Sequence, residues 1–583
     1  MNPSSHDFQG NRERTHIPDR TEMGRDRHIQ SQWKISSDIV PNSVHEVIGT
    51  LLGNRNLDPE SLSGELKDLG GYLAINGMES GAQLMARHMA AGHKLVLIGD
   101  YDCDGITSTA QLALFLTELG YTNFAVIIPL REEGYGFPER AVRENPDARL
   151  FVAMDCGTLD RKPIQLACSA GAECIVIDHH EVTVGETAPA SVIINPKHPD
   201  CCSPFRDFCS AGLTLLFLAA LRRAIRGSFP SVPSLGGKYL ALAAIGTVAD
   251  LVPLVSANRI LARSGLKSMN SSPWAPVSLL AGAAGLNGKP LTAGHISYYI
   301  GPRINAAGRI SDARIAYDLL TTTEPEEQAR LARDLNSLNA ARQAEEETIL
   351  NSIRAKLAGH LPRQTRTLVM GDPSWPAGVI GIAASRVQQE LQYAPVVILA
   401  INEKDGTARG SARSIPGFDI HRALQDCSDL LLRWGGHKAA AGLTIPVENI
   451  ALFSTRLEQI AQSCPAEIFI PSGRVDMQIP LELIGPELIE ALHQLEPHGM
   501  GNPAPVFALR NVPFTVRKLF GREREHMRFG FASRLDGIFW RGVQRLPDFS
   551  DGKKAQLDFV FQVGWDSYYS RPSLDIKDAG RLF

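Results

Sequence analysis

The chain has 583 residues, with 59 Lys and Arg against 63 Asp and Glu, so its formal net charge is −4. This length predicts about three to five domains, and 44% hydrophobic with 21% charged residues is typical of chains that bury ordinary cores. These values exclude a collagen, a coiled coil, a mostly disordered chain and a uniformly basic nucleic-acid binder, while a local basic groove stays compatible with them.

The first 35 residues are polar and lack the apolar stretch of a secretory signal, so we expect a disordered leader. The nine cysteines are odd in number and form no C-x-x-C pair, which favours free thiols in a reducing compartment. We find no apolar stretch of about 18 residues that would span a membrane. The sequence therefore predicts a soluble cytoplasmic protein without a membrane partner.

From about residue 80 to 200, helical segments alternate with short apolar strands. Continuous apolar strands of this kind are typical of a parallel sheet covered by helices on both faces. Helices are expected at 211–226 and 237–250, and a long charged helix at 324–360 indicates a connector between domains. The strands are expected at 94–99, 124–129, 150–154, 174–177 and 191–194.

A second α/β block is expected at about 365–460, with strands at 367–370 and 395–400 and a helix at 379–391. Beyond residue 465, short alternating segments predict a small all-β barrel. The fold class is therefore α/β with a C-terminal β-barrel. The predicted boundaries are 1–35 for the leader, 36–320 for the parallel-sheet domain, 321–362 for the connector helix, 363–464 for the second α/β domain and 465–583 for the barrel.

Carboxylates and imidazoles gather where the predicted strands end, which is where ligands bind in open parallel sheets. Like charges this close raise one another's pKa unless a cation neutralises them. Oxygen ligands with one or two imidazoles suit Mn²⁺ or Mg²⁺, whereas a solvated acidic loop or ordinary turn caps are the alternatives for single residues. The residues are Asp100, Asp102, Asp104, Asp155, Asp178, His179, His180 and, at the end of a helix, Asp250.

This set holds enough carboxylates for two ions, and paired ions activate water and neutralise charge in phosphoryl transfer. The residues alone therefore predict hydrolysis of a phosphoester or phosphoanhydride. Cys103 and Cys156 lie within the same motifs. The carboxylates beside them prefer hard ions such as Mn²⁺ or Mg²⁺, so we expect both cysteines to be small packing residues rather than zinc ligands.

Eight motifs resemble, in chain order, those of one known family. The four metal motifs resemble the DHH phosphoesterase superfamily, and the whole set, over about residues 40–580, resembles its RecJ branch of single-strand-specific exonucleases. The resemblance implies a DHH domain, a DHH-associated domain and an OB-like single-strand-binding barrel. The motifs are DYDCDG (100–105), REEGYGF (131–137), MDCG (154–157), DHH (178–180), GTVADLVPL (246–254), GPRINAAGRI (301–310), SARSIPGFDI (411–420) and GGHKAAAGLTI (435–445).

The resemblance also implies which residues hold two ions, Mn²⁺ or Mg²⁺. Many members carry a His four residues before the position of Asp102, where this chain has Ile98, so the second ligand set stays open. His180 with Asp178 is expected to act at the scissile phosphate, the alternative being that His180 orients His179. The first ion would be held by Asp104, Asp155, His179 and Asp250, and the second by Asp102 and the bridging Asp155, assisted by Asp100.

Six further residues are expected to bind phosphate or DNA: Arg131, Arg303, Arg309, Ser411, Arg413 and His437. Arginine suits bidentate phosphate contacts, and small residues at 305–308 let backbone approach a phosphate. Ser411 and Arg413, expected in a polar loop, would capture a terminal phosphate together with Arg131. His437 is expected before an Ala- and Gly-rich helical run. Surface ion pairs, an ordinary turn and a buried core histidine are the alternatives.

Residues 510–545 carry nine Lys and Arg against three Asp and Glu, an excess of six positive charges. Aromatic residues are interleaved with them and could stack bases, although a barrel core is the commoner place for such side chains. The leading hypothesis is a metal-dependent exonuclease that degrades single-stranded DNA from the 5′ end to mononucleotides, in recombination and repair. The resemblance implies a single-strand-binding protein and a helicase as partners.

Two other functions stay open from the sequence. A small-substrate phosphodiesterase of the same superfamily would lack the C-terminal barrel. A non-catalytic DNA-binding scaffold would have lost its metal ligands, and apart from Ile98 the motifs are intact.

Overall fold

The computed structural model describes residues 32–583 except 58, 183–184, 361–364, 392, 533–534 and 567–568. The described residues form two compact units, one of Glu347–Gly473 with Gln32 and the other of Trp33–Glu346 with Arg474–Phe583. Helix α13 (Pro325–His360) is the predicted connector and passes from one unit to the other. The predicted leader lies outside the described residues as far as 31, but its last four residues form strand β1 (Gln32–Ile35), which corrects that part.

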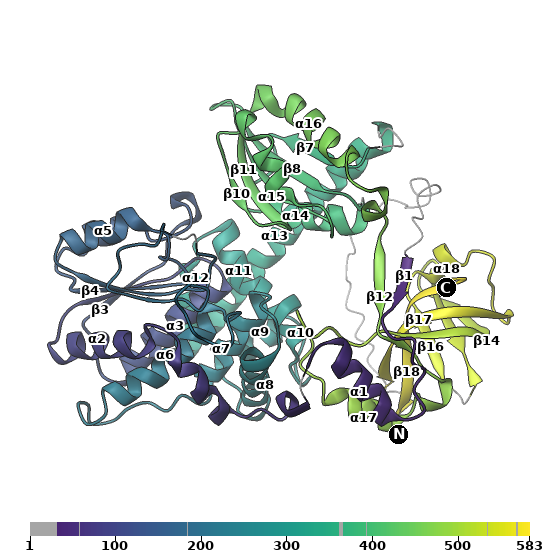
Figure 1. Ribbon diagram of the computed structural model, residues 1–583, viewed down its shortest axis with the longest axis horizontal. Coiled ribbons are helices and arrows are strands. Elements are labelled where there is room, and N and C mark those ends of the chain that lie inside the picture. Colours follow the sequence, from purple (N-terminus) through teal and green to yellow (C-terminus); the bar gives the residue numbers. More distant parts are fainter. Residues whose placement is uncertain are drawn as a thin grey trace, which may run out of the picture. The chain divides into compact units, whose positions relative to one another are not determined.

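A five-stranded parallel sheet in the order β3-β2-β4-β5-β6 confirms the first α/β block. Its strands are β2 (Leu95–Ile98), β3 (Phe124–Ile127), β4 (Leu150–Met154), β5 (Glu173–Ile177) and β6 (Val192–Ile194). Helices cover both faces (Figure 1). One face packs on α4 (Glu139–Glu144) and α5 (Arg161–Ser169), the other on α2 (Met78–Ala90), α3 (Cys103–Glu118) and α6 (Ser210–Ala224). Because the strands are parallel, they all end at the same edge.

A helical region completes this domain. Its helices are α7 (Lys238–Ala249), α8 (Ser256–Ser271), α9 (Ala275–Ala283), α10 (Ala293–His295), the π-helix η4 (Ile296–Ile300), α11 (Gly301–Ile310) and α12 (Arg314–Thr321), with short turns η1 (Pro59–Leu62), η2 (Leu66–Ala74) and η3 (Arg131–Glu133). Within the described ranges, no helix combines the length and apolar character needed to cross a membrane.

The other unit holds a five-stranded mixed sheet in the order β10-β11-β9-β8-β7. Its strands are β7 (Leu368–Asp372), β8 (Val396–Asn402), β9 (Thr407–Arg413), β10 (Arg433–Gly436) and β11 (Ala440–Pro446), and its helices are α14 (Ile380–Arg386), η5 (Val387–Leu391), α15 (Ile420–Gln425), η6 (Ser428–Leu430), η7 (Val447–Asn449), α16 (Ile450–Gln462) and η8 (Ala466–Phe469).

Two sequence predictions are wrong in this unit. The Ala- and Gly-rich run expected to be helical is strand β11, because every residue of it pairs with β9, Gly442 lying opposite Ser411. Ser411 and Arg413, expected in a loop, lie within β9.

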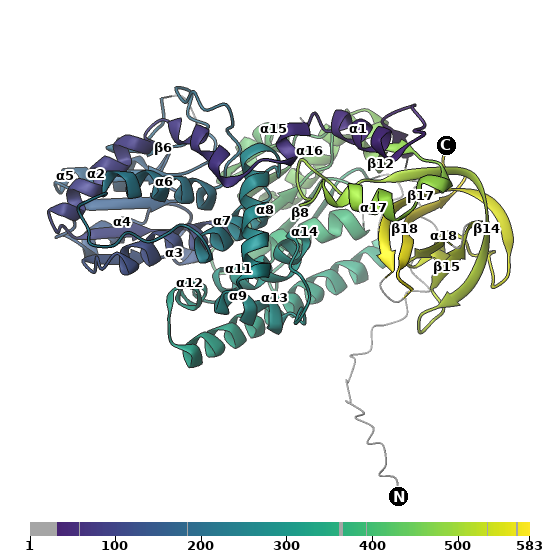
Figure 2. The same ribbon diagram turned by 90° about the horizontal axis from the view of Figure 1, so that it is seen from below.

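The C-terminal strands close into the expected barrel, with β17 pairing both β18 and β14 (Figure 2). Its strands are β13 (Met477–Gln478), β14 (Phe507–Phe520), β15 (His526–Gly530), β16 (Asp536–Phe539), β17 (Lys554–Asp566) and β18 (Arg571–Gly580), accompanied by η9 (Leu481–Leu483), α17 (Pro486–His493) and α18 (Gly542–Arg545). Strand β12 (Ser472–Val475) forms a separate two-stranded sheet with β1. Phe529, Phe531 and Phe539 fill its core, whereas Trp540 is 56% exposed.

Helix α1 (Val44–Asn54) packs with this barrel, although the predicted boundary at residue 36 placed it in the parallel-sheet domain. Val47, Leu51 and Leu52 are buried in the barrel's hydrophobic core. Next to them, Arg55 forms an ion pair of 2.8 Å with Asp476, and its side chain is only 4% exposed. The boundary is therefore corrected: the segment around α1 belongs to the C-terminal domain.

Candidate metal centre

The turn after β2 places three carboxylates side by side at the start of α3. Asp102 is the N-cap of this helix, and its Oδ1 accepts the N–H groups of Asp104 and Gly105, each at 3.0 Å. A Cβ on Gly105 would lie 2.5 Å from the backbone nitrogen of Asp100. The motif needs glycine there because the chain folds back tightly on Asp100.

Asp155 follows β4 with φ +64°, a left-handed conformation that is uncommon outside glycine and concentrates at functional sites. Its Oδ1 accepts a hydrogen bond from Ser210 Oγ at 3.1 Å. The backbone N–H groups of Ser210 and Ala211 donate to the Asp104 carboxylate at 2.7 and 2.8 Å. The first turn of α6 thus orients two carboxylates. Sequence reasoning missed Ser210, whose signal was the run of small residues that opens this helix.

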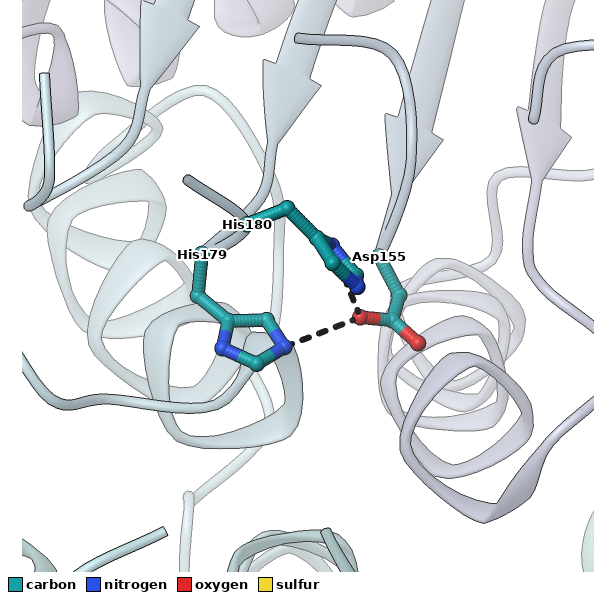
Figure 3. A group of neighbouring side chains, drawn as sticks. All are labelled: Asp155, His179 and His180. Carbon is teal, nitrogen blue, oxygen red and sulfur yellow. Dashed lines mark ion pairs between the residues drawn. The ribbon is translucent and has the colours of Figure 1, made fainter. Parts of the chain in front are cut away.

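Three carboxylates converge on the imidazole of His179. Its Nε2 lies 3.3 Å from Asp155 Oδ1, 3.5 Å from Asp250 Oδ2 and 3.7 Å from Asp104 Oδ2. Figure 3 shows the Asp155 carboxylate facing the rings of both His179 and His180, which come from the neighbouring strand end. His179 is buried, and neither ring nitrogen has a hydrogen-bond partner among the described residues. A cation fits this arrangement, because it would satisfy the imidazole and the carboxylates together.

The structure brings together all six predicted metal ligands in three groups that share residues. Ligand atoms within 4.8 Å of one another define each group. Asp155 completes the second group and also lies beside His179, as a bridging ligand would. Ile98 is buried in β2, so the second group consists of carboxylates alone. The first group is Asp104, His179 and Asp250, and the second is Asp100, Asp102 and Asp155. The third, Asp155, His179 and His180, shares His179 with the first group and Asp155 with the second.

Burial and mutual repulsion raise the pKa values of these carboxyls. Burial, followed by the charge of Asp102, raises the pKa of Asp104 to about 6. Burial, followed by the charge of Asp104, raises the pKa of Asp250 to about 8. The pKa values of Asp100 and Asp155 rise well above their usual range for the same two reasons. Without a cation, this cluster of charges is unfavourable.

The two histidines are in different charge states at neutral pH. Burial, followed by the charge of His180, lowers the pKa of His179 to about 3, so its imidazole is neutral. Burial opposes protonation of His180, but the hydrogen bond from Nδ1 to Asp178 Oδ1, 2.7 Å long, and the charge of Asp178 raise its pKa to about 9. A neutral ligand-type imidazole therefore lies beside a protonated one.

The small-residue run of α11 contacts the DYDCDG turn, and the expected approach of its backbone to a phosphate stays a prediction. A Cβ on Gly308 would lie 2.4 Å from the carbonyl oxygen of Tyr101. Asn305 Oδ1 accepts the N–H of Cys103 at 2.8 Å. Arg131 donates to the carbonyl of Gly308 at 2.7 Å and lies over the Tyr101 ring. These contacts hold the metal-binding turn from outside.

The guanidinium of Arg303 forms hydrogen bonds with other residues of the protein and not with the carboxylates of the metal centre. Its guanidinium donates to Asn336 Oδ1 at 3.1 Å and to the carbonyls of Tyr299 and Ala283 at 2.8 and 3.4 Å. These contacts favour a structural role for Arg303. Arg309 lies in the last turn of α11.

In the other unit, Ser411 and Arg413 form a polar pair on β9. Arg413 donates to Ser411 Oγ and to Ser385 Oγ, each at 2.9 Å, and burial lowers its pKa. A Cβ on Gly381 would lie 3.1 Å from Ser411 Oγ and 3.2 Å from Arg413 Nη2, so a larger residue would fit this helix against the pair only if the two side chains shifted. His437 is exposed between β10 and β11, which excludes the buried-core alternative.

Tyr135 lies at the metal centre, although sequence reasoning assigned it no role. Its hydroxyl donates to the backbone carbonyl of Asp155 at 2.8 Å and lies 2.9 Å from His180 Nδ1. The signal was an aromatic residue between two glycines in the REEGYGF motif. Cys103 and Cys156, expected to be packing residues, are both buried in hydrophobic clusters.

Three family models match the chain: the N-terminal domain of the DHH family at 94–247, the DHHA1 domain at 364–463 and the RecJ OB domain at 475–578. The single-stranded-DNA-specific exonuclease RecJ of Bacillus subtilis is 30% identical over 560 residues, covering 94% of this chain and 70% of that protein. RecJ of Thermus thermophilus is 35% identical over 468 residues, covering 80% of this chain and 65% of that protein. A crystal structure of the Thermus thermophilus RecJ in complex with Mn²⁺ matches with a TM-score of 0.79 and 29% identity, over 95% of this chain and 80% of that one.

Proposed function

The chain belongs to the RecJ family, and from that membership we propose that it is a metal-dependent exonuclease that degrades single-stranded DNA from the 5′ end to mononucleotides. The observation that carries this proposal is the convergence of Asp104, Asp155 and Asp250 on a buried His179 that has no hydrogen-bond partner among the residues the structure describes. This set of ligand atoms suits Mn²⁺ or Mg²⁺. Two such ions bound side by side catalyse the hydrolysis of phosphodiesters by water.

Each charged residue then has a distinct role in hydrolysis. Asp104, His179 and Asp250 would hold one ion, Asp100 and Asp102 the other, and Asp155 both. Such ions polarise the phosphoryl group and lower the pKa of water. His180 donates its Nδ1 proton to Asp178, which leaves Nε2 as the nitrogen that faces the substrate. Because its pKa is raised to about 9, His180 is protonated at neutral pH and delivers a proton from Nε2 to the departing 3′ oxygen.

We assign recognition of the 5′-terminal phosphate to Ser411 and Arg413. The guanidinium is already oriented by Ser385 and Ser411, and burial, which lowers its pKa, makes its positive charge costly, a cost that a bound anion would offset. Arg413→Ala should therefore slow cleavage of 5′-phosphorylated strands far more than that of 5′-hydroxyl strands. Equal loss on both substrates would contradict this assignment.

The barrel is proposed to bind the single strand beyond the active site. Trp540 is exposed, and its ring lies 4.8 Å from that of His526 and 5.7 Å from that of Phe520, which forms an aromatic surface within the basic stretch. Base stacking on such rings contributes about 1–3 kcal/mol per base. Trp540→Ala should therefore weaken single-strand binding about tenfold, and unchanged affinity would contradict a binding role for this surface.

The cellular setting follows from the same reasoning. A single-strand-binding protein and a helicase are the partners we propose, because one covers and the other produces the substrate. All nine cysteines lie among the described residues and are free thiols, which supports a reducing, cytoplasmic compartment.

One assay tests the proposed function directly. End-labelled single- and double-stranded DNA, labelled at either end, is incubated with the protein in Mn²⁺, in Mg²⁺ or in EDTA. We expect mononucleotides from the 5′ end of single strands in either metal and no cleavage in EDTA. Cleavage in EDTA, or equal cleavage of duplex DNA, would contradict the proposal.

A further inference from the structure

Tyr135 lies on a short loop that is fixed from both sides. Its neighbours Gly134 and Gly136 have φ values of +93° and +111°, which glycine adopts without strain. Asp160 accepts the N–H of Phe137 at 2.8 Å, and a Cβ on Gly136 would lie 2.7 Å from the Asp160 carboxylate. Phe137 is buried and packs on the sheet. The loop therefore presents the tyrosine in one orientation.

The hydroxyl of Tyr135 connects two parts of the metal centre. It has one hydrogen, which it donates to the carbonyl of Asp155 at 2.8 Å. Its oxygen can therefore only accept from His180, whose Nδ1 lies 2.9 Å away and Nε2 3.3 Å away, while Nδ1 also lies 2.7 Å from Asp178 Oδ1. The edge of one ring meets the face of the other, with centroids 5.2 Å apart. A single hydroxyl thus holds both the backbone of Asp155 and the imidazole of His180.

We propose that Tyr135 is a positioning residue for hydrolysis: its hydroxyl fixes the left-handed backbone of Asp155 and holds the imidazole ring of His180 in place. This inference rests on the proposed function. Without the hydroxyl, the carbonyl of Asp155 loses its partner and only Asp178 orients His180. Tyr135 acts through these two residues and not on the substrate, so its loss should change turnover rather than DNA binding.

The test compares Tyr135→Phe with the full wild-type chain. Steady-state cleavage of 5′-phosphorylated single strands gives kcat and KM, electron paramagnetic resonance of free Mn²⁺ gives the metal Kd without DNA, and thermal unfolding gives Tm. We expect kcat to fall about tenfold, the effect of one well-placed hydrogen bond. We also expect the Mn²⁺ Kd to rise severalfold, because Asp155 is held less firmly, with KM and Tm unchanged.

Tyr239→Phe is the matched control. Its hydroxyl donates to Glu118 Oε2 at 2.8 Å, near the start of α7, whereas Asp250 follows the other end of that helix. Gly136→Ala gives an independent test, because it keeps the hydroxyl but pushes the loop off Asp160. We expect the control to retain wild-type kcat and Gly136→Ala to reproduce the loss.

Three results would overturn the proposal: a Tyr135→Phe kcat within twofold of wild type, a raised KM at unchanged kcat, or an equal loss in Tyr239→Phe. A raised KM would make Tyr135 a DNA contact. If the wild-type chain does not cleave single strands, the proposed function fails, and the Mn²⁺ Kd alone decides the role of Tyr135. An unchanged Kd would then overturn it.

Discussion

Replacing Asp250 by Asn should stabilise the metal-free protein while abolishing its activity. Asp250 is the C-cap of α7, and the structure shows the Asp250 carboxylate facing His179 Nε2 at 3.5 Å. Burial, followed by repulsion from Asp104 and Asp102, raises its pKa from 3.8 to about 8. In the unfolded chain this carboxyl ionises freely, so above pH 3.8 its ionisation favours the unfolded state over the native one. Asparagine is neutral in both states and escapes that penalty.

The size and the pH dependence of the effect follow from linkage. A raised pKa gives stability that is fully present below pH 3.8 and lost as pH rises through about 8. At about 1.4 kcal/mol per pKa unit, the rise from 3.8 to about 8 gives an upper bound above pH 8 of about 6 kcal/mol. The side chain is 23% exposed, and neighbouring carboxyls can take up the proton instead, so we expect about 2 kcal/mol. The difference between variant and wild type should vanish near pH 4.

Thermal unfolding at pH 4.5, 6.5 and 8.5, with EDTA or with excess Mn²⁺, measures this directly. In EDTA at pH 8.5, Asp250→Asn should unfold several degrees above wild type. In Mn²⁺ the order should reverse, because wild type gains more from binding the ion. The exposed Asp548→Asn makes the same charge change and should shift neither curve. A variant less stable than wild type in EDTA at pH 8.5 would refute the reasoning.

Three further predictions test other parts of the structure. Asp155→Ala and His179→Ala should each abolish hydrolysis and leave single-strand affinity nearly intact, so robust turnover by either in saturating Mn²⁺ would exclude it as a ligand. Gly381→Ala should displace the Arg413 guanidinium, because the new Cβ meets its Nη2 at 3.2 Å, and should reduce the preference for 5′-phosphorylated strands at unchanged Tm. Leu51→Ala should cost about 2–5 kcal/mol in denaturant unfolding, since Leu51 is fully buried in the barrel core, and wild-type stability would contradict that packing.

The sequence predicted the elements whose signal is local. Strand ends carrying Asp100 and Asp155 were found because apolar runs followed by carboxylates identify both the strand and its functional edge. Strand β11 was mistaken for a helix because Ala favours helices, yet pairing with β9 outweighed that preference. Ser210 and Tyr135 were missed because their roles depend on contacts between distant segments, which no spacing in the sequence reveals.

The ion pair between Arg55 and Asp476 joins residues 421 positions apart. A ribosome adding about 5–20 residues per second needs roughly 20–80 s to synthesise that interval. During this time the apolar face of α1 has been made, but the barrel core that buries it has not. Through most of its synthesis the nascent chain therefore exposes the apolar face of α1. The C-terminal domain can finish folding only when its last strands have been synthesised. Early termination of translation should yield chains that chaperones retain, even where the parallel-sheet domain is complete.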